Sequence, residues 1–181
     1  NFNKPCGVDV FFALSHGVHR GILKKGKEDD RAYFLKNLVK STDNVKFDIY
    51  GLNNKQPLWA DHYFKTIENA KMGLNLSRGK PIKYYSSDRL AQIIGNGLVT
   101  LIDEKTEYSD FFSNKEMVFY KNIDQLKEKI IHIANDEKLR KSIGMMGKKK
   151  YFKYFNSKVI AEFIIDKTLY SGINRSYMWD K

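Results

Sequence analysis

Val8-Asp-Val-Phe-Phe-Ala-Leu14 and the segment after it, Ser15-His-Gly-Val-His-Arg-Gly-Ile-Leu-Lys-Lys-Gly-Lys-Glu-Asp-Asp30, decide the fold of this chain. The first stretch is almost continuously apolar, which predicts a buried strand. The second places Arg20 and Lys25 among glycines and leads into a helical pattern from Arg31. A strand, a basic glycine-containing loop and a helix together form a phosphate-binding arrangement in α/β proteins. A solvated basic loop that holds no ligand remains an open alternative for this segment.

Strand and helix patterns alternate after this first unit. Apolar or alternating runs predict further strands at 45–50, 72–76, 98–102 and 116–120. Apolar residues spaced three and four apart predict helices at 31–41, 60–71, 86–95, 123–134, 137–155 and 158–170. This order predicts an α/β fold with a single Rossmann-like, doubly wound, mostly parallel sheet and closing C-terminal helices. We expect one domain over residues 1–170 and a tail over residues 171–181.

Composition is that of a globular chain with a core. The chain has 181 residues, of which 42% are hydrophobic and 14% aromatic, so disorder is excluded. No apolar run approaches the roughly 18 residues needed to span a bilayer, and no signal peptide is recognisable. The single cysteine, Cys6, excludes an internal disulfide framework and a cysteine-built metal site. We expect a cytoplasmic location and, because the sequence begins with Asn1, a piece of a longer protein.

The charge of the chain is strongly and unevenly basic. Its formal net charge is +11, and residues 121–158 hold eleven Lys or Arg against four Asp or Glu. A basic face suits nucleic acid, an anionic membrane surface or a phosphorylated substrate. The pattern of basic and aromatic residues typical of RNA binders is missing, so no nucleic-acid partner is expected. Membrane contact through the lysines and aromatics of 148–155 and a solvated lysine face over core aromatics both remain open.

A second candidate anion site lies at the start of the helix predicted after the third strand. Its free backbone N–H groups and serine hydroxyls can meet an anion there. Because parallel strands end at one edge of a sheet, we expect segments 15–26, 51–59, 77–89 and 103–108 to line one crevice. Helix capping by Ser86 or Asp88, and pairing of Arg89 with a neighbour, remain alternatives. The candidate binding residues are Arg20, Lys25, Gly26, Arg78, Ser86, Ser87, Asp88, Arg89 and Gln92.

Three motifs, in this order and spacing, resemble the C-terminal domain of GT-B glycosyltransferases of the group-1 type, closest to the CgeB-like branch. The first is Arg20-Gly-Ile-Leu-Lys-Lys25-Gly26 after the first strand. The second is Phe47-Asp-Ile-Tyr-Gly51 followed by Asn69-Ala-Lys-Met-Gly-Leu-Asn-Leu76. The third is Arg89, Gln92 and Gly97 before a branched strand. The resemblance covers roughly residues 8–169.

The resemblance implies half of a GT-B fold that binds a nucleoside-diphosphate sugar. Arg20 and Lys25 would hold the donor diphosphate and stabilise the leaving nucleoside diphosphate electrostatically. Residues 86–89 would lie beside the diphosphate and sugar, and the segment after Gly51 would approach the base. It implies no cofactor and no metal. The acceptor would be a glycan or glycolipid, as in polysaccharide biosynthesis, at the inner face of the cytoplasmic membrane.

Two departures from the family pattern leave a second function open. Gln92 stands where the family has an acidic residue, and a neutral amide offers one acceptor oxygen to sugar hydroxyls instead of two. Only one Rossmann-like domain fits in 181 residues, so the acceptor domain and the catalytic base of a hexosyltransferase-type enzyme would lie outside this chain. No catalytic residue is therefore assigned. A non-catalytic nucleotide-binding, sugar-binding or interaction module derived from such a domain is the alternative.

Overall fold

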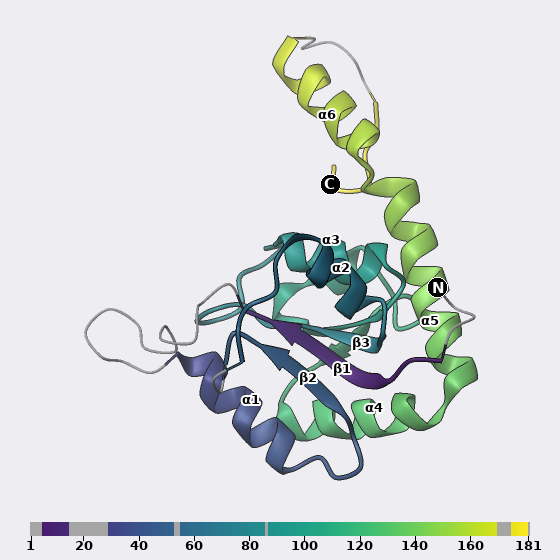
Figure 1. Cartoon of the computed structure of the whole chain (residues 1–181). Helices are drawn as coiled ribbons and strands as arrows, with labels where there is room; N and C mark the ends of the chain where they lie inside the picture. Colours follow the sequence, from purple (N-terminus) through teal and green to yellow (C-terminus); the bar gives the residue numbers. More distant parts are fainter. Residues whose placement is uncertain (1–4, 15–28, 53–54, 86, 170–174, 181) are drawn as a thin grey trace.

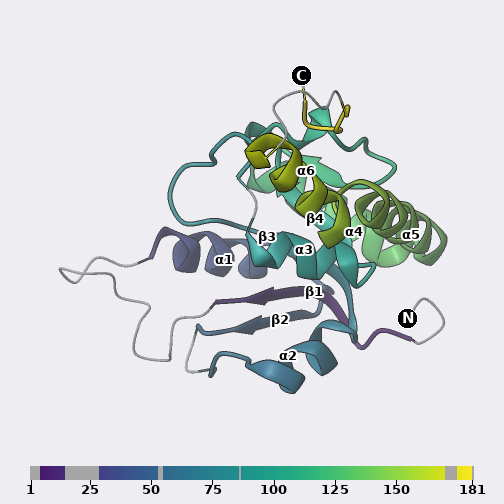
Figure 2. The same cartoon turned by 90° about the horizontal axis from the view of Figure 1, so that it is seen from above.

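The computed structural model describes residues 5–14, 29–52, 55–85, 87–169 and 175–180. Its centre is a five-stranded sheet in the order β2-β1-β3-β4-β5, with every neighbouring pair of strands parallel. Figure 2 shows β1 and β2 side by side. This arrangement confirms the predicted α/β, Rossmann-like sheet. The strands are β1 Val8–Ala13, β2 Phe47–Tyr50, β3 Ala70–Asn75, β4 Val99–Asp103 and β5 Val118–Tyr120.

Helices cover both faces of the sheet. In Figure 1, α1 and α4 lie below the strands, whereas α2 and α3 lie above them. Helix α5 packs against α3 and β4, and it also contacts α4. Asp29, Asn122 and Asp136 accept a backbone N–H at the starts of α1, α4 and α5, which satisfies a donor that a helix otherwise leaves unpaired. The helices are α1 Asp30–Lys40, α2 Ala60–Ile67, α3 Asp88–Gly95, α4 Ile123–Asn135, α5 Glu137–Tyr154 and α6 Ser157–Leu169, with short 3-10 turns η2 Glu104–Thr106 and η3 Tyr108–Asp110.

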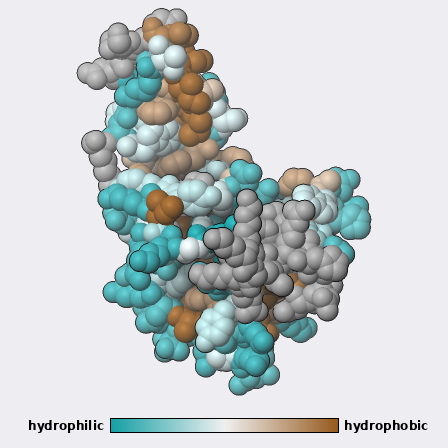
Figure 3. Space-filling model, turned by 90° about the vertical axis from the view of Figure 1, so that its left-hand side faces the viewer, coloured by the Kyte–Doolittle hydropathy of each residue, from teal (hydrophilic) through white to brown (hydrophobic). Residues whose placement is uncertain are grey.

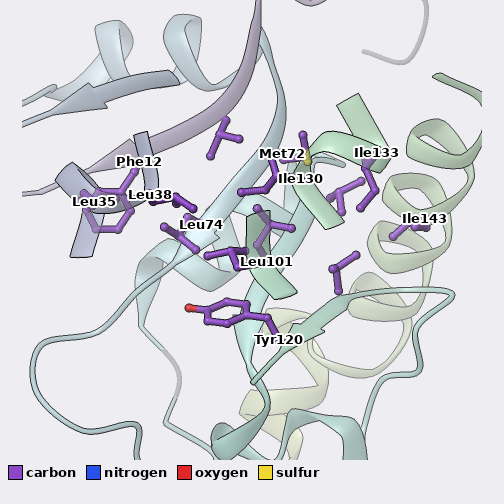
Figure 4. Close-up of a cluster of buried hydrophobic side chains, with 14 of the residues drawn as sticks. Phe12, Leu35, Leu38, Met72, Leu74, Leu101, Tyr120, Ile130, Ile133 and Ile143 are labelled. Carbon is purple, nitrogen blue, oxygen red and sulfur yellow. The ribbon is translucent and has the colours of Figure 1, made fainter. Parts of the chain in front are cut away.

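Alternation along the strands divides the core between the two faces. Phe12 belongs to the cluster under α1 and α4, whereas its neighbour Phe11 belongs to a cluster beneath α2 and α3. Figure 4 shows the first cluster, in which Leu74 and Leu101 of adjacent strands lie near Phe12 and Ile130. Both faces are buried because successive strand side chains point in opposite directions. The sheet is therefore a fixed platform, and the loops at its carboxyl edge carry the site.

One predicted boundary is wrong. The sequence pattern extends a helix to residue 71, but α2 ends at Ile67 and β3 begins at Ala70. Asn69 makes the difference: its side chain accepts the Gly7 N–H at 2.9 Å, and its carbonyl accepts the Val8 N–H at 3.2 Å. Pairing with β1 thus takes these residues into the sheet, because sheet bonds and burial of Ala70 outweigh a local helical periodicity.

Aromatic residues join the C-terminal helices to the described part of the tail. Tyr151 of α5 and Phe155, which directly follows α5, stack at 5.7 Å. Both pack against a buried cluster, which confirms the core interpretation for these two aromatics, whereas Phe152 is exposed. In the tail, Trp179 contacts Phe155 and Phe163, both at 5.4 Å. Residues 175–180 therefore dock on α6, and the boundary at residue 170 stays a prediction.

Helix α6 stands away from the sheet at the end of α5 (Figure 1). Four of its apolar side chains are exposed, and Figure 3 shows a hydrophobic strip along this upper part of the molecule. None of the helices in the described ranges has both the length and the apolar composition that crossing a membrane requires. The exposed residues are Ile160, Ile164, Ile165 and Leu169.

Candidate functional site

A pocket opens at the carboxyl end of β1, between the starts of α2 and α3. Its volume is about 490 Å³, within the roughly 300–1,000 Å³ range of small-molecule sites. Four of the predicted site residues line it, so the third motif does reach the expected edge of the sheet. The lining residues are Ala13, Leu14, Leu58, Trp59, Ala60, Tyr63, Phe64, Ser87, Asp88, Arg89 and Gln92.

Arg89 is held firmly in the pocket wall. Its Nη1 donates a hydrogen bond to the Leu76 carbonyl at 2.9 Å, and its guanidinium lies 4.9 Å from the centre of the Phe12 ring. Burial, with the nearby Arg31 guanidinium, lowers the pKa of Arg89 below its usual value. The ordinary pKa of arginine is so high that the side chain remains charged at neutral pH. Arg89 therefore presents a fixed positive charge beside the end of β3.

The start of α3 has the features of an anion site. Ser87 is the N-cap residue, but its hydroxyl makes no capping hydrogen bond. The Ser87 Oγ is also buried without a hydrogen-bond partner among the described residues. A buried hydroxyl with no partner has lost its hydrogen bonds to water and gained none in the protein, which costs free energy. The first N–H groups of a helix attract negative charge. The hydroxyl and the helix start thus offer unused donors to a ligand.

Amphipathicity orients α3 as the sequence predicts. Leu90, Ile93 and Ile94 are buried beneath the helix, while Arg89 and Gln92 lie on the pocket side. Gly73 allows this close approach, because a Cβ there would come within 2.6 Å of Ile93 side-chain carbons. The packing of α3 on β3 therefore fixes where Arg89 and Gln92 point.

A second cationic feature lies at the start of α1; it contains the predicted site residue Arg78 together with Arg31, which the sequence analysis did not assign to the site. Arg31 binds the fully buried Asp29 carboxylate through Nε at 3.0 Å and Nη2 at 2.7 Å. Arg78, half-exposed, approaches the same carboxylate at 3.8 Å. Two guanidinium groups thus share the Asp29 carboxylate, and Arg31 lies close enough to Arg89 to lower the pKa of Arg89. The signal available in the sequence was the Asp29-x-Arg31 spacing directly after the basic segment 15–28.

Aromatic side chains at the start of α2 form another wall; Trp59 lies in the segment 51–59 that the sequence assigns to the crevice, whereas Tyr63 and Phe64 were not assigned to it. Trp59 is 66% exposed and Phe64 51% exposed. Tyr63 packs edge-on against both Phe11 and Phe64. Exposed aromatic rings beside a polar helix start suit a ligand with a flat apolar part.

The expectation of one crevice needs correction. Residues 58–59 and 87–89 share the pocket just described, but residues 76, 77, 79, 81, 82 and 85 line a different cavity with Asp103 and Thr106. The cavity that includes Asp103 and Thr106 is also lined by Asp30, Arg31 and Phe34 of α1, whereas the pocket beside Arg89 is lined by Tyr63 and Phe64 of α2. Four predicted site residues, Arg20, Lys25, Gly26 and Ser86, lie outside the described residues.

Comparison with known proteins settles the family. Residues 30–166, well over half of the chain, match the glycosyl transferase-like family. The chain belongs to this family. No curated protein matches the sequence.

Solved structures place this glycosyl transferase-like chain in the GT-B fold. TarM aligns with a TM-score of 0.62 and 15% identity, over 90% of this chain and 35% of that chain. An S. aureus TarM variant in complex with fondaparinux, α-GlcNAc-glycerol and UDP aligns with a TM-score of 0.63 and 15% identity, over 91% and 36%. An α1,3-fucosyltransferase with GDP-fucose aligns with a TM-score of 0.59 and 10% identity, over 98% and 50%. The chain thus spans half or less of these structures.

Proposed function

We propose that this chain is the sugar-nucleotide-binding domain of a glycosyltransferase that moves a sugar from a nucleoside-diphosphate donor to a glycan or glycolipid acceptor. The observation that carries this proposal is the pocket at the start of α3, where Arg89, Gln92 and the unpaired Ser87 hydroxyl meet. Membership of the glycosyl transferase-like family supports it. The UDP and GDP-fucose bound in structures of similar fold support a nucleotide donor.

Each part of the donor has a counterpart in this pocket. The base lies against Trp59, whose exposed ring offers a stacking surface. The Gln92 amide accepts a hydrogen bond from a ribose hydroxyl. The diphosphate lies toward the start of α3, where Ser87 and the backbone N–H groups donate to it.

Stabilisation of the leaving group is electrostatic in this proposal. When the glycosidic bond breaks, negative charge grows on the nucleoside diphosphate. The resemblance to the family assigns the neutralisation of that charge to Arg20 and Lys25. Arg89 adds a fixed positive charge. The Asp29–Arg31 pair positions the start of α1, which follows the basic segment 15–28 in the sequence. No residue of this chain is assigned as the catalytic base, which we place in a preceding acceptor domain.

The finer assignments follow from the sequence motifs. The spacing of Arg89, Gln92 and Gly97 supports the CgeB-like branch, a hexosyltransferase type of activity and a role in polysaccharide biosynthesis. The lysine-rich α5 supports a location of the protein at the anionic inner face of the cytoplasmic membrane. Domain boundaries at residue 170 and a donor site that needs no bound cofactor complete the proposal.

A second candidate is a binding module without turnover. Gln92 favours a binding module, because an amide offers one acceptor oxygen where a carboxylate offers two, and so binds two ribose hydroxyls less strongly. Both candidates bind nucleotide, so binding and turnover have to be measured separately.

Calorimetric titration tests the proposal. A panel of nucleoside diphosphates and their sugars is titrated into the wild-type chain, Arg20→Ala and Arg175→Ala, the last removing a half-exposed arginine that pairs with Asp166 beside α6. We expect saturable binding of one nucleotide class by the wild type and Arg175→Ala, and at least tenfold weaker binding by Arg20→Ala. Absence of binding across the panel would overturn the proposal.

A further inference from the structure

The connection between β3 and α3, residues 76–87, is long for a fold of this kind. Most strand-to-helix connections in α/β proteins have roughly two to six residues. Residues 82–85 of this one are exposed. The connection carries Arg78 near its start and Ser87 at its end, two of the predicted binding residues. A long exposed segment keeps one shape only where contacts with the core hold it.

Tyr84 anchors this connection to the segment that follows β4. Its backbone N–H donates to the Thr106 carbonyl at 2.8 Å, and its hydroxyl donates to the Asp110 carboxylate at 2.5 Å. The Tyr108 hydroxyl donates to the Tyr84 carbonyl at 3.3 Å. The Tyr84 ring lies 4.9 Å from the Phe111 ring, centre to centre. The amide, the carbonyl and the side chain of one residue therefore all contact the same segment.

That segment is itself held by the core. Tyr108, Phe111 and Phe112 belong to one buried cluster and are each at most 6% exposed. Asp103, the last residue of β4, caps the following turn by accepting the Lys105 N–H at 2.9 Å. Tyr84 thus ties an exposed connection to a fixed platform at the carboxyl end of β4.

Backbone strain marks the same contact. Tyr84 has a φ of 55° and Glu107 a φ of 54°, a region that favours glycine because a Cβ crowds the backbone there. In the described ranges, four non-glycine residues have a positive φ. Two of them meet here, since Thr106, which accepts the Tyr84 N–H, directly precedes Glu107. Strain of this kind persists only where the surrounding contacts fix it, and it is concentrated at functional sites.

The anchor lies three residues before the proposed diphosphate site. Ser87 is the N-cap residue of α3, and its buried hydroxyl makes no hydrogen bond within the described residues. The body of α3 is fixed by packing, because Ile93 lies against Gly73 of β3. The residues before the helix take their place from the connection. Three residues span at most about 10 Å, so the position of Tyr84 restricts where the Ser87 hydroxyl and the first helical N–H groups lie.

We propose that Tyr84 is a positioning residue, which holds the start of α3 in the conformation that receives the diphosphate of a nucleotide. This inference rests on the proposed function, and Tyr84 acts in it through Ser87 without touching the ligand. If only the anchored conformation binds, the apparent dissociation constant is the intrinsic one divided by the anchored fraction. A variant that releases the connection therefore binds the diphosphate more weakly, although the binding groups are all still present.

Calorimetric titration of three variants tests the proposal. Tyr84→Phe removes the hydroxyl that binds Asp110 and keeps the ring against Phe111. Tyr84→Gly also removes the ring but relieves the positive φ. The matched control, Tyr33→Phe, removes a hydroxyl from a 67% exposed tyrosine of α1. For the nucleoside diphosphate that the wild type binds, we expect binding about fivefold weaker in Tyr84→Phe, at least tenfold weaker in Tyr84→Gly and unchanged in Tyr33→Phe.

A second ligand separates positioning from partial unfolding. The matching nucleoside, which has no phosphates, is titrated into the same proteins and followed by ¹H–¹⁵N NMR. Its base stacks on Trp59 in the proposed function, and Trp59 belongs to another segment of the pocket wall. We therefore expect the nucleoside to bind the wild type and all three variants equally. Unfolding of part of the protein would weaken the binding of nucleoside and diphosphate by the same factor.

A double-mutant cycle identifies the hydrogen bond that matters. Asp110→Ala weakens diphosphate binding by about the same factor as Tyr84→Phe, and the two changes together weaken it no further. A wild-type chain that binds no nucleotide would refute the proposed function and this inference with it. Diphosphate binding by the wild type that is matched by both Tyr84 variants would overturn the inference alone. Equal losses of nucleoside and diphosphate affinity, or additive effects in the cycle, would overturn it as well.

Discussion

Arg31 binds both oxygens of the Asp29 carboxylate, through Nε at 3.0 Å and Nη2 at 2.7 Å, with the carboxylate fully buried. The same carboxylate accepts the Arg31 backbone N–H at 3.0 Å and so caps α1. These three hydrogen bonds hold the start of α1 in place, directly after the basic segment 15–28 of the sequence. The side-chain hydrogen bond from Arg31 lowers the pKa of Asp29 from 3.8 to about 2.

Asp29→Asn is expected to destabilise the chain by about 3 kcal/mol, because Arg31 is then left buried without its counter-charge. The matched control, Asp30→Asn, changes an exposed neighbour in the same helical turn and shifts stability by less than about 0.5 kcal/mol. Urea denaturation at pH 7 measures both. Equal free energies of unfolding for the two variants would show that the Asp29–Arg31 ion pair does not stabilise the fold.

Acid stability follows from the same pair. The folded-state pKa of Asp29 lies below its ordinary value of 3.8. The ionised carboxylate therefore contributes fully to the free energy of unfolding above pH 3.8, and this contribution is lost as the pH falls toward 2. The contribution amounts to about 2 kcal/mol. The free energy of unfolding is measured by urea denaturation between pH 5 and pH 2. Over this range it falls by about 2 kcal/mol less in Asp29→Asn than in the wild type. Parallel pH profiles would contradict the assignment.

Gly147→Ala is expected to destabilise the chain by about 2 kcal/mol, although alanine favours helices. A Cβ at this position would lie 2.4 Å from the Glu116 carbonyl oxygen, so α5 would have to move off the segment before β5. In the control, Gly95→Ala, the nearest contact is an ordinary 3.9 Å to Phe152, and stability is unchanged or slightly raised. Thermal unfolding of both variants tests this contrast, which a neutral Gly147→Ala would refute.

Ser87→Ala separates a cap from a ligand donor. The Ser87 side chain makes no capping hydrogen bond, so Ser87→Ala keeps the free energy of unfolding within about 0.5 kcal/mol of the wild type. In the control, Asn122→Ala deletes a capping hydrogen bond from the Gln125 N–H at 2.9 Å and lowers the free energy of unfolding by about 1 kcal/mol. Nucleoside-diphosphate affinity falls in Ser87→Ala alone. A stable Ser87→Ala variant with wild-type affinity would remove this hydroxyl from the proposed site.

Gln92→Glu is expected to bind the nucleotide several-fold more tightly, because a carboxylate accepts from both ribose hydroxyls. Gln125→Glu makes the same change of charge outside the pocket and leaves affinity unaltered. Calorimetry at pH 7 measures both. Weaker binding by Gln92→Glu would indicate that position 92 faces the phosphates and not the ribose.

Sequence patterns predict the sheet well and the site only in part. The apolar runs around Phe12 and Leu101 identify buried strands because burial on both faces leaves a continuous signal. The end of α2 is missed because Asn69 bonds to Gly7, which is distant in sequence. Arg31 and the aromatic residues Tyr63 and Phe64 of α2 are missed for a related reason: their roles depend on partners that only the fold brings together. Ser87, Arg89 and Gln92 are found because they occupy one helix start and one helix face.

Fluorescence of one tryptophan tests the central claim most directly. The chain has two tryptophans, Trp59 in the pocket wall and Trp179 in the tail. In Trp179→Phe only Trp59 remains, and the account predicts saturable quenching of its emission by one class of nucleoside diphosphate, as the base stacks on the ring. Trp59→Phe, which retains Trp179, shows no such change. Emission that is unaffected in Trp179→Phe, or quenched equally in both variants, would contradict a nucleotide site between α2 and α3.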